Sequence, residues 1–230
     1  FNELKKNGME VERNNLLNWN FDKQFNNPVI GVDEVGRGPW AGPVVSGAVY
    51  IPRGKKKLLP KNLNDSKKLT SQQRQLIMNQ LEHSCIYGTG FSSANEIDSL
   101  GIIRATWLSM ERAINNMYLL IPSILNAVSI LIDGPQKPDF EKNFNGNIYC
   151  IKGGDGISPS IAAASIIAKQ TRDQEMKRLD VISPGYGWSN NMGYGTKEHQ
   201  KALAKHGPTQ QHRKSFKPIK NLLRLNTDTI

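Results

Sequence analysis

Residues 29–39 read Val-Ile-Gly-Val-Asp-Glu-Val-Gly-Arg-Gly-Pro. A short apolar run ends there in two adjacent carboxylates, Asp33 and Glu34, and the glycines Gly36 and Gly38 follow directly. The apolar run predicts a buried strand. Glycine lets the backbone after that strand approach a ligand closely, because no Cβ intervenes. We therefore expect metal-binding charge at the end of a buried strand, with a flexible turn beside it.

The composition indicates a polyanionic partner. The 230 residues carry a formal net charge of +10, with 30 Lys and Arg against 20 Asp and Glu. This excess favours nucleic acid as the partner, with a merely basic surface as the alternative. Cys85 and Cys150 form no C-x-x-C pair, which argues against zinc and dithiol chemistry. No apolar segment reaches the ~20 residues of a spanning helix, so we predict a cytoplasmic protein without a membrane span.

Strand and helix patterns alternate along the chain. We predict strands over residues 29–33, 44–51, 86–91, 128–132 and 148–151. We predict helices over residues 70–82, 102–120, 160–179 and 196–205. The alternation is typical of an α/β fold with a mostly parallel or mixed sheet. Before these elements, residues 1–27 read as a polar N-terminal arm with a short helix near Leu16.

Local signals mark the helix ends and one buried face. Thr70 and Gln73 have the spacing of a capping box, and Thr196 can cap the last of these helices, with Gly207 past its end. The helix over residues 102–120 repeats apolar side chains at the rhythm of one buried face. That predicted face consists of Ile103, Trp107, Met110, Ile114 and Met117.

Acidic residues follow three separate apolar strands, at Asp33 and Glu34, at Asp133 and at Asp155. Parallel strands bring their C-terminal ends to one edge of a sheet, so these carboxylates can converge. Like charges that close repel one another unless a cation lies among them. Oxygen ligands without Cys or His suit Mg²⁺ or Mn²⁺, and two such ions can activate water against a phosphodiester.

A simpler interpretation remains for each acid. Asp133 and Asp155 stand beside glycines and, taken singly, read as turn formers. Asp33 and Glu34 are neighbours in a strand and so point to opposite faces. Both can serve one site only if the strand bends or ends there.

Several ordered motifs match those of a known family. They are Asp-Glu-Val-Gly-Arg-Gly-Pro at 33–39, Ala-Gly-Pro-Val-Val at 41–45, Leu-Asn-Asp-Ser-Lys-Lys-Leu at 63–69, Leu-Ile-Asp-Gly at 131–134, Ser-Ile-Ala-Ala-Ala-Ser-Ile-Ile-Ala-Lys-Gln-Thr-Arg-Asp at 160–173, Gly-Tyr-Gly-Thr at 193–196 and His-Arg-Lys-Ser-Phe at 212–216. The chain resembles bacterial type 2 ribonuclease H (ribonuclease HII) over residues 28–218. The resemblance implies an RNase H-like catalytic domain at 28–180, with a mixed β-sheet flanked by helices. Residues 181–230 would form a helical C-terminal extension that contributes to substrate binding.

The resemblance also implies the metal ligands. Asp33, Glu34, Asp133 and Asp155 would hold the metal, with two divalent ions, Mg²⁺ or Mn²⁺, expected when substrate is bound. Asp173 is the rival for the fourth ligand. It lies inside a predicted helix, where ion-paired acids are common, and we interpret it as structural.

Substrate contacts are implied in the same way. Gly36, Arg37 and Gly38 would sense the 2′-OH, and Ser66 and Lys67, with Asp65 before them, would contact backbone phosphate. Tyr194 would sense the deoxyribose that follows a ribonucleotide, whereas from sequence alone a buried tyrosine is the better interpretation. Family members often carry a basic residue where this chain has Met192. The sequence leaves two roles open, that of Lys55–Lys57 and that of His212 and Arg213, which either face phosphate or pack.

The implied function is that of a metal-dependent endonuclease. It would hydrolyse the RNA strand of RNA–DNA hybrids and nick 5′ to single ribonucleotides in duplex DNA, leaving a 5′-phosphate and a 3′-hydroxyl, in DNA replication and repair. We expect a monomer, with hybrid and ribonucleotide-containing DNA as partners and no protein partner.

Three other functions compete with this one. Type 3 ribonuclease H usually lacks the Gly-Arg-Gly triplet, which this chain carries at residues 36–38. A hybrid-binding protein without catalysis would not need all four acids. A nucleotide-binding α/β enzyme would need a phosphate loop such as G-x-x-x-x-G-K-[ST], which the sequence lacks.

Overall fold

A five-stranded mixed sheet forms the centre of the molecule. The computed structural model describes residues 17–18, 20–25, 28–60, 63, 69–122, 128–140, 144 and 146–227. The strand order is β3-β2-β1-β4-β5. The strands are β1 (Val29–Val35), β2 (Val44–Tyr50), β3 (Ile86–Ser92), β4 (Val128–Asp133) and β5 (Gly146–Ile151). β4 pairs in parallel with β1 and β5, whereas β2 pairs antiparallel with both of its neighbours, β1 and β3. The predicted mixed α/β sheet is therefore confirmed.

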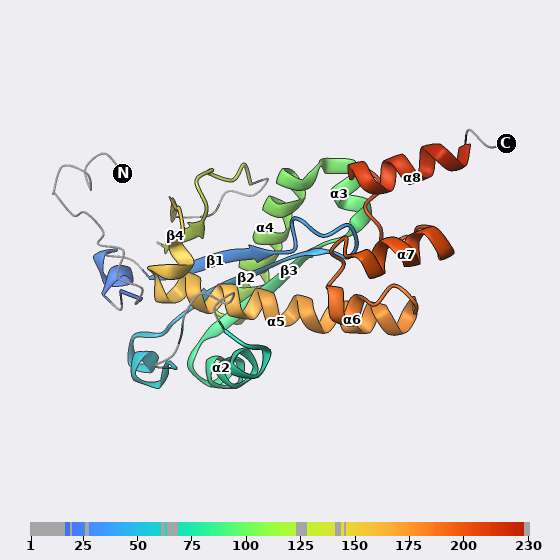
Figure 1. Ribbon diagram of the computed structural model, residues 1–230. Coiled ribbons are helices and arrows are strands. Elements are labelled where there is room, and N and C mark those ends of the chain that lie inside the picture. Colours follow the sequence, from blue (N-terminus) through green and yellow to red (C-terminus); the bar gives the residue numbers. More distant parts are fainter. Residues whose placement is uncertain are drawn as a thin grey trace.

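Helices cover both faces of this sheet. α5 (Pro159–Ile182) crosses one face with α2 (Ser71–Ser84) beside it, and α4 (Ile102–Leu120) covers the other face (Figure 1). The remaining helices are α3 (Ala94–Leu100), α6 (Trp188–Asn191), α7 (Lys197–His206) and α8 (Lys217–Thr227), and the 3-10 helices are η1 (Phe21–Gln24), η2 (Arg53–Leu58) and η5 (Gly154–Gly156). α7 and α8 extend from one end of the sheet, drawn in orange and red in Figure 1.

Glycines in the strands let the helices lie close to the sheet. A Cβ on Gly31 of β1 would stand 2.1 Å from the Ser160 carbonyl carbon of α5. A Cβ on Gly90 of β3 would stand 2.1 Å from the Ser109 carbonyl oxygen of α4. The small residues Ala162, Ala163 and Ala164 of α5 are fully buried, on the side of the sheet that α5 covers, and the sequence predicted this close packing.

The predicted helix signals hold, with one exception on α4. Thr70 and Gln73 form the capping box of α2, and Thr196 caps α7, which ends at Gly207. α4 has the predicted bounds, but Ile103 is 42% exposed rather than buried. It lies in the first turn of α4, where the helix borders a pocket instead of the sheet.

The two ends of the chain join the domain more closely than the predicted boundaries suggest. The predicted helix near Leu16 lies outside the described residues. Within the predicted arm, η1 places the buried Asp22 carboxylate against the start of α5, where it accepts hydrogen bonds from Ser158 Oγ (2.6 Å) and the Ser160 amide (3.1 Å). At the other boundary, α5 continues to Ile182. The division at residues 27 and 180 stays a prediction. No helix among the described residues is long and apolar enough to span a membrane.

Candidate metal centre and substrate-binding surface

Three of the four predicted metal ligands meet at one edge of the sheet. Asp33, Asp133 and Asp155 each offer a carboxylate oxygen, and these atoms all lie within 4.8 Å of one another. Val32 of β1 pairs in parallel with Ile132 of β4, so the next residue on each strand is an acid at the same level. Asp155 comes from η5, which follows β5. Parallel strand ends therefore bring together acids that lie far apart in sequence, 100 residues in the case of Asp33 and Asp133.

Backbone amides hold these carboxylates in place. The Glu34 amide donates to Asp33 Oδ1 at 2.7 Å. The Gly154 amide donates to Asp133 Oδ1 at 2.8 Å, which ties the end of β4 to the turn that carries Asp155. Gly153 enters that turn in the left-handed region, with φ 68°, which favours glycine. Asp33 is 5% exposed and Asp155 is 7% exposed, so the cluster is set into the protein.

The electrostatics of the cluster suit a divalent cation. Burial raises the pKa of Asp33 well above its usual range, and the negative charges of Glu34 and Asp133 raise it further. Burial also raises the pKa of Glu34, although the nearby Arg37 guanidinium opposes this shift. A cation among these groups would relieve the repulsion. The donor atoms are all carboxylate oxygens, which fit a hard ion such as Mg²⁺ or Mn²⁺.

Glu34 lies on the other side of the sheet from Asp33. β1 pairs regularly with β2 through Val35, so the strand does not bend at the acids. The Asp33 side chain hydrogen-bonds Ser165 of α5, whereas Glu34 lines a pocket of about 140 Å³ next to α4. Asp133 interacts electrostatically with both acids and lines the same pocket as Glu34. The strand does not bend between the two acids, and Glu34 is not among the three clustered carboxylates, so Asp133, which interacts with each, is the group that links them.

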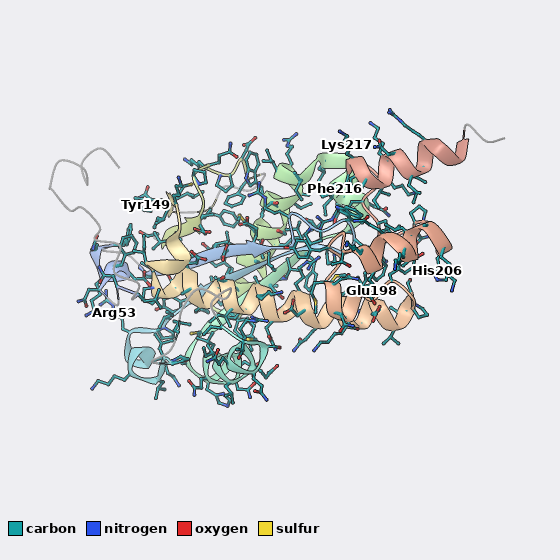
Figure 2. All side chains as sticks on the ribbon, viewed as in Figure 1. Arg53, Tyr149, Glu198, His206, Phe216 and Lys217 are labelled. Atoms are coloured by element: carbon teal, nitrogen blue, oxygen red, sulfur yellow. The ribbon has the colours of Figure 1, made fainter. Side chains whose placement is uncertain are left out.

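Two buried arginines hold the loop that carries Gly36, Arg37 and Gly38. Arg213 donates to the carbonyl oxygens of Gly36 (2.6 Å), Arg37 (2.9 Å) and Gly42 (3.1 Å). Arg213 is fully buried, and its guanidinium lies 5.1 Å from the centre of the Phe216 ring, just before α8 (Figure 2). Arg213 thus packs inward, which decides between the two roles that the sequence left open for it.

The second arginine, Arg172 of α5, holds the same loop from its other side in the chain, and we call the two arginines the clamp. It donates to the carbonyl oxygens of Pro43 (2.9 Å), Met192 (3.0 Å) and Ala41 (3.3 Å). Its relative exposure is 1%. The sequence predicts neither arginine as an anchor of this loop, because most of the carbonyl groups that they bind belong to segments far away in the chain. Met192 has φ 51° and turns its carbonyl to Arg172.

Tyr194 presents its ring to solvent beside the glycine loop. The side chain is 49% exposed, so the interpretation as a buried tyrosine was wrong. A Cβ on Gly38 would lie 3.5 Å from Tyr194 Cε1, which places the ring next to this loop. The Tyr194 carbonyl accepts hydrogen bonds from the Thr196 amide (2.8 Å) and His199 Nδ1 (3.0 Å). An exposed ring on a firmly held backbone is a suitable stacking surface for a sugar or a base.

Other predicted residues have different positions. Asp65, Ser66 and Lys67 lie outside the described residues. Asp173 pairs with Lys169 at 2.6 Å and with Arg74 at 3.4 Å, which confirms the interpretation of this acid as an ion-paired helix residue.

A histidine pair lies behind Tyr194. The Tyr194 carbonyl can only accept, so His199 Nδ1 carries a proton and His199 Nε2 accepts. The Thr209 amide donates to His212 Nδ1 at 2.9 Å, so the proton of His212 is on Nε2, which donates to His199 Nε2 at 3.0 Å. Trp188 Nε1 donates to the same acceptor at 3.2 Å. Both rings are neutral in this arrangement, and the hydrogen bonds determine their tautomers.

Acid is expected to weaken the fold through this pair. Burial and the neighbouring His199 lower the pKa of His212 from 6.5 to about 4. As the pH falls, His212 of the unfolded chain is protonated before His212 of the folded protein. The contribution of His212 to the free energy of unfolding is therefore fully present above pH 6.5 and is lost as the pH drops toward 4. A shift of this size corresponds to roughly 3 kcal/mol.

Urea denaturation at pH 7 and pH 5 measures this effect as the difference between wild type and His212→Gln. The variant should lose less stability than wild type over this interval. His83→Gln, at an exposed position on α2, is the matched control and should keep the wild-type dependence. Equal pH dependence in wild type and His212→Gln would contradict the assignment.

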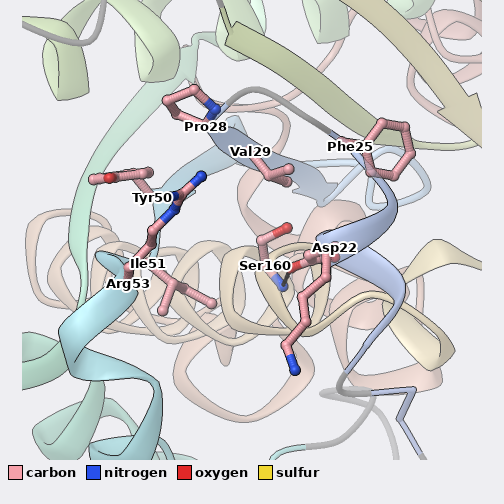
Figure 3. A pocket seen from close by; sticks show the side chains of 9 residues that line it. Asp22, Phe25, Pro28, Val29, Tyr50, Ile51, Arg53 and Ser160 are labelled. Carbon is pink, nitrogen blue, oxygen red and sulfur yellow. Dashed lines mark hydrogen bonds between the residues drawn. The ribbon is translucent and has the colours of Figure 1, made fainter.

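A larger cavity lies away from the acids. It has a volume of about 380 Å³ and includes Val29, at the start of β1, whereas the carboxylates stand at the strand's other end. Figure 3 shows Asp22, Tyr50 and Arg53 around it. None of the residues that line it belongs to the predicted site, whereas Glu34 and Asp133 line the smaller pocket.

The chain is similar to known ribonucleases in sequence. A family model described as ribonuclease HII matches residues 30–219. Ribonuclease HII of Zymomonas mobilis is 42% identical over 211 residues, which cover 92% of this chain and 94% of that protein. Ribonuclease HII of Jannaschia sp. is 45% identical over 202 residues, which cover 88% of this chain and 96% of that protein.

Solved structures share the fold. Ribonuclease HII of Archaeoglobus fulgidus, solved in complex with PCNA, aligns with a TM-score of 0.66 and 22% identity over 83% of this chain and 95% of that chain. Bst-RNase HIII in complex with Mn²⁺ aligns with a TM-score of 0.69 and 21% identity over 88% of this chain and 71% of that chain. At these identities the likeness concerns the fold alone.

Ribonucleases HII and HIII share this fold, and the sequence relatives indicate to which of the two types this chain belongs. The matched family model and the two sequence relatives named above are ribonuclease HII, so the type 3 alternative is not favoured. The match spans all five strands except the first residue of β1, and it includes the three clustered carboxylates. The chain belongs to the ribonuclease HII family and is an endoribonuclease.

Proposed function

We propose that this enzyme, whose family hydrolyses the RNA strand of RNA–DNA hybrids, also nicks duplex DNA on the 5′ side of a single embedded ribonucleotide. The products would be a 5′-phosphate and a 3′-hydroxyl. The observation that carries the proposal is the position of the exposed Tyr194 ring beside Gly38, in the loop that follows β1, the strand that carries Asp33 of the three-carboxylate cluster. A non-catalytic hybrid-binding protein would have no use for such a cluster.

The carboxylates are proposed as the catalytic and metal-binding groups. Asp33, Asp133 and Asp155 would hold the metal directly, and Glu34 would serve the same centre from the α4 side through the shared pocket with Asp133. Two divalent ions bound there with substrate, Mg²⁺ or Mn²⁺, would supply an activated water and stabilise the leaving oxygen. The amides of Glu34 and Gly154 keep the ligand oxygens in place.

The glycine loop is proposed to distinguish RNA from DNA. The 2′-OH is the group by which a protein separates the two, and an A-form-like duplex displays it in a wide, shallow minor groove. Gly36 and Gly38 let the backbone approach this hydroxyl, and the exposed Arg37 side chain stands beside Glu34. The Tyr194 ring would contact the next sugar, a deoxyribose. A 2′-OH on that sugar would crowd the ring.

The surface around this centre fits a duplex. Exposed basic residues lie on both C-terminal helices, namely Lys197, Lys201 and Lys205 of α7 and Lys217, Lys220 and Arg224 of α8. They would neutralise backbone phosphates, as would Ser66 and Lys67. We propose on these grounds that the C-terminal extension contributes to substrate binding. The enzyme is further proposed to act as a cytoplasmic monomer in DNA replication and repair.

Cleavage of two substrates tests the function. A DNA duplex with a single ribonucleotide and a uniform RNA–DNA hybrid are compared for wild type and Tyr194→Ala with Mg²⁺ present. Loss of a stacking contact of ~1–3 kcal/mol predicts a drop of roughly 5-fold to 150-fold in kcat/KM on the single-ribonucleotide duplex, and a smaller drop on the hybrid.

Tyr194→Phe keeps the ring and is the matched control, so it should retain most of the activity on the single-ribonucleotide duplex. The position of the nick and the chemistry of the new ends are read on a sequencing gel with end-labelled strands. The proposal fails if wild type never cuts the single-ribonucleotide duplex.

A further inference from the structure

Tyr194 is hydrogen-bonded through its backbone, while its half-exposed ring stands beside Gly38. The Tyr194 amide donates to the Asn191 carbonyl at 2.9 Å, and its carbonyl accepts from Thr196 and His199. The hydrogen bond from His199 Nδ1 links the Tyr194 carbonyl itself to a buried side chain. His199 itself has no exposed surface. Whatever holds the His199 ring therefore also limits where the Tyr194 ring can stand.

The His199 ring is held by a second imidazole. His212 Nε2 and Trp188 Nε1 both donate to His199 Nε2, at 3.0 Å and 3.2 Å. His212 is in turn fixed by Thr209, whose amide and hydroxyl both bond its Nδ1. Each ring nitrogen of the pair has a partner, so neither ring can turn over without losing hydrogen bonds in a buried place.

The histidine pair is connected to the glycine loop through His212 and its neighbour Arg213. His212 forms an isolated antiparallel bridge with Ala41, and the next residue is Arg213, which holds the Gly36 carbonyl. On the other side, the Gly193 carbonyl accepts from the amides of Trp40 (2.8 Å) and Ala41 (3.3 Å). The segments around Gly36, Tyr194 and His212 therefore form one hydrogen-bonded unit.

We infer that His199 and His212 are positioning residues that set the place of the Tyr194 ring relative to the glycine loop, and thereby the selectivity for an RNA–DNA junction. The inference rests on the proposed function, in which the glycine loop and Tyr194 meet two successive sugars. To recognise the two successive sugars, the glycine loop and the Tyr194 ring must stand one nucleotide step apart. A displacement of about 1 Å at such a site can reduce the rate 100-fold.

Amide side chains can replace the two ring nitrogens one at a time. The asparagine amide group lies two bonds from Cβ, as Nδ1 does in histidine, whereas the glutamine amide nitrogen lies three bonds away, as Nε2 does. His199→Asn therefore retains a donor to the Tyr194 carbonyl but leaves Trp188 and His212 without their acceptor. His199→Gln provides an acceptor for Trp188 and His212 but loses the donor to Tyr194.

The two variants are expected to separate stability from selectivity. His199→Gln should be the more stable variant, because buried donors keep an acceptor. His199→Asn should be the more selective one, because Tyr194 keeps its anchor. The measured quantity is the ratio of kcat/KM on the single-ribonucleotide duplex to that on the uniform hybrid. We expect this ratio to fall about 10-fold or more in His199→Gln, and to stay near wild type in His199→Asn.

The order should reverse at position 212. His212→Gln retains the donor to His199 and should keep the ratio, whereas His212→Asn retains only the acceptor for Thr209 and should lose it. A general loss of packing would affect selectivity in the same order as stability at both positions. Melting temperatures of all four variants are recorded, and activity is measured well below the lowest of them, with His83→Gln on α2 as the control.

The outcomes distinguish the inference from the proposed function. If Tyr194→Ala leaves the substrate ratio unchanged, the proposed junction sensing fails. If Tyr194→Ala changes the ratio but selectivity follows stability in the histidine variants, the sensing stands and the positioning role of His199 and His212 is overturned. Asparagine superior at 199 and glutamine superior at 212 is the result expected from the hydrogen bonds.

Discussion

Asp33→Asn is expected to lower metal-dependent cleavage of an RNA–DNA hybrid by roughly 100-fold to 1000-fold, the loss typical when a charge-stabilising group of an active site is removed. The amide can still accept from the Glu34 amide, so the local shape is kept. What disappears is one negative charge among three clustered carboxylates. Divalent cations are therefore expected to bind more weakly and to lose one oxygen ligand of full charge.

The same substitution should stabilise the metal-free protein. Burial and repulsion raise the pKa of Asp33 above its ordinary value of 3.8. Above pH 3.8 the unfolded chain has lost this proton while the folded state retains it, so stability falls as the pH rises toward the raised pKa. Asparagine has no such cost at neutral pH. A raised melting temperature together with lost activity would identify a carboxylate kept for metal binding rather than for folding.

Thermal melts with EDTA and with Mg²⁺ provide the measurement. Mg²⁺ should raise the melting temperature of wild type, through preferential binding to the folded state, and should do so much less for Asp33→Asn. Glu175→Gln is the matched control, because Glu175 pairs with Arg178 on α5, apart from the carboxylate cluster. Full activity of Asp33→Asn with Mg²⁺ would show that the site assignment is wrong.

Gly36→Ala is expected to lower kcat/KM by about 100-fold and to destabilise the fold. Gly36 has φ +93°, and a Cβ there would stand 2.2 Å from Arg172 Nε and 2.9 Å from the Pro43 carbonyl oxygen. The left-handed region alone costs roughly 1–2 kcal/mol for a residue with a side chain. Arg172 cannot yield cheaply, because it is buried and holds three carbonyl groups. The loop must therefore move, and a displacement of about 1 Å is enough for a loss of this size.

Two other glycines make this prediction specific. A Cβ on Gly54 would meet nothing within 4 Å, so Gly54→Ala should leave stability and activity close to wild type. A Cβ on Gly38 would make only an ordinary contact with Tyr194 at 3.5 Å, so Gly38→Ala should fold normally and report on the substrate contact alone. Urea denaturation and hybrid cleavage measure the three variants. Wild-type stability and activity of Gly36→Ala would contradict the clamp.

Much of the fold could be predicted from local pattern. β4 ends at Asp133 as the apolar run 128–132 suggested, and α4 has the predicted bounds. Such signals are local because a strand needs only a short apolar run, and a helix start needs only a capping residue. The convergence of Asp33, Asp133 and Asp155 was also predictable, because parallel strands leave their C-terminal ends at one edge.

Other features depend on which face of a helix or strand a residue occupies, and the sequence does not assign these faces. Ile103 follows the helical rhythm of α4 yet borders a pocket, because the helix extends past the sheet that its rhythm predicts it should cover. Glu34 follows Asp33 directly, and the two acids are separated by a strand that stays regular through Val35. Their common relation to Asp133 arises only when β4 lies beside β1.

The sequence by itself determined the α/β class, the family and the acids of the candidate centre, because each of these depends on short motifs and on the order of elements. Only the tertiary structure decided that Arg172 and Arg213 point inward, that His199 and His212 share hydrogen bonds, and that Tyr194 is exposed. An arginine in a basic chain reads as a phosphate contact until the carbonyl groups it satisfies are known. Those carbonyls belong to residues 36–43 and 192, and only folding brings them to Arg172 and Arg213.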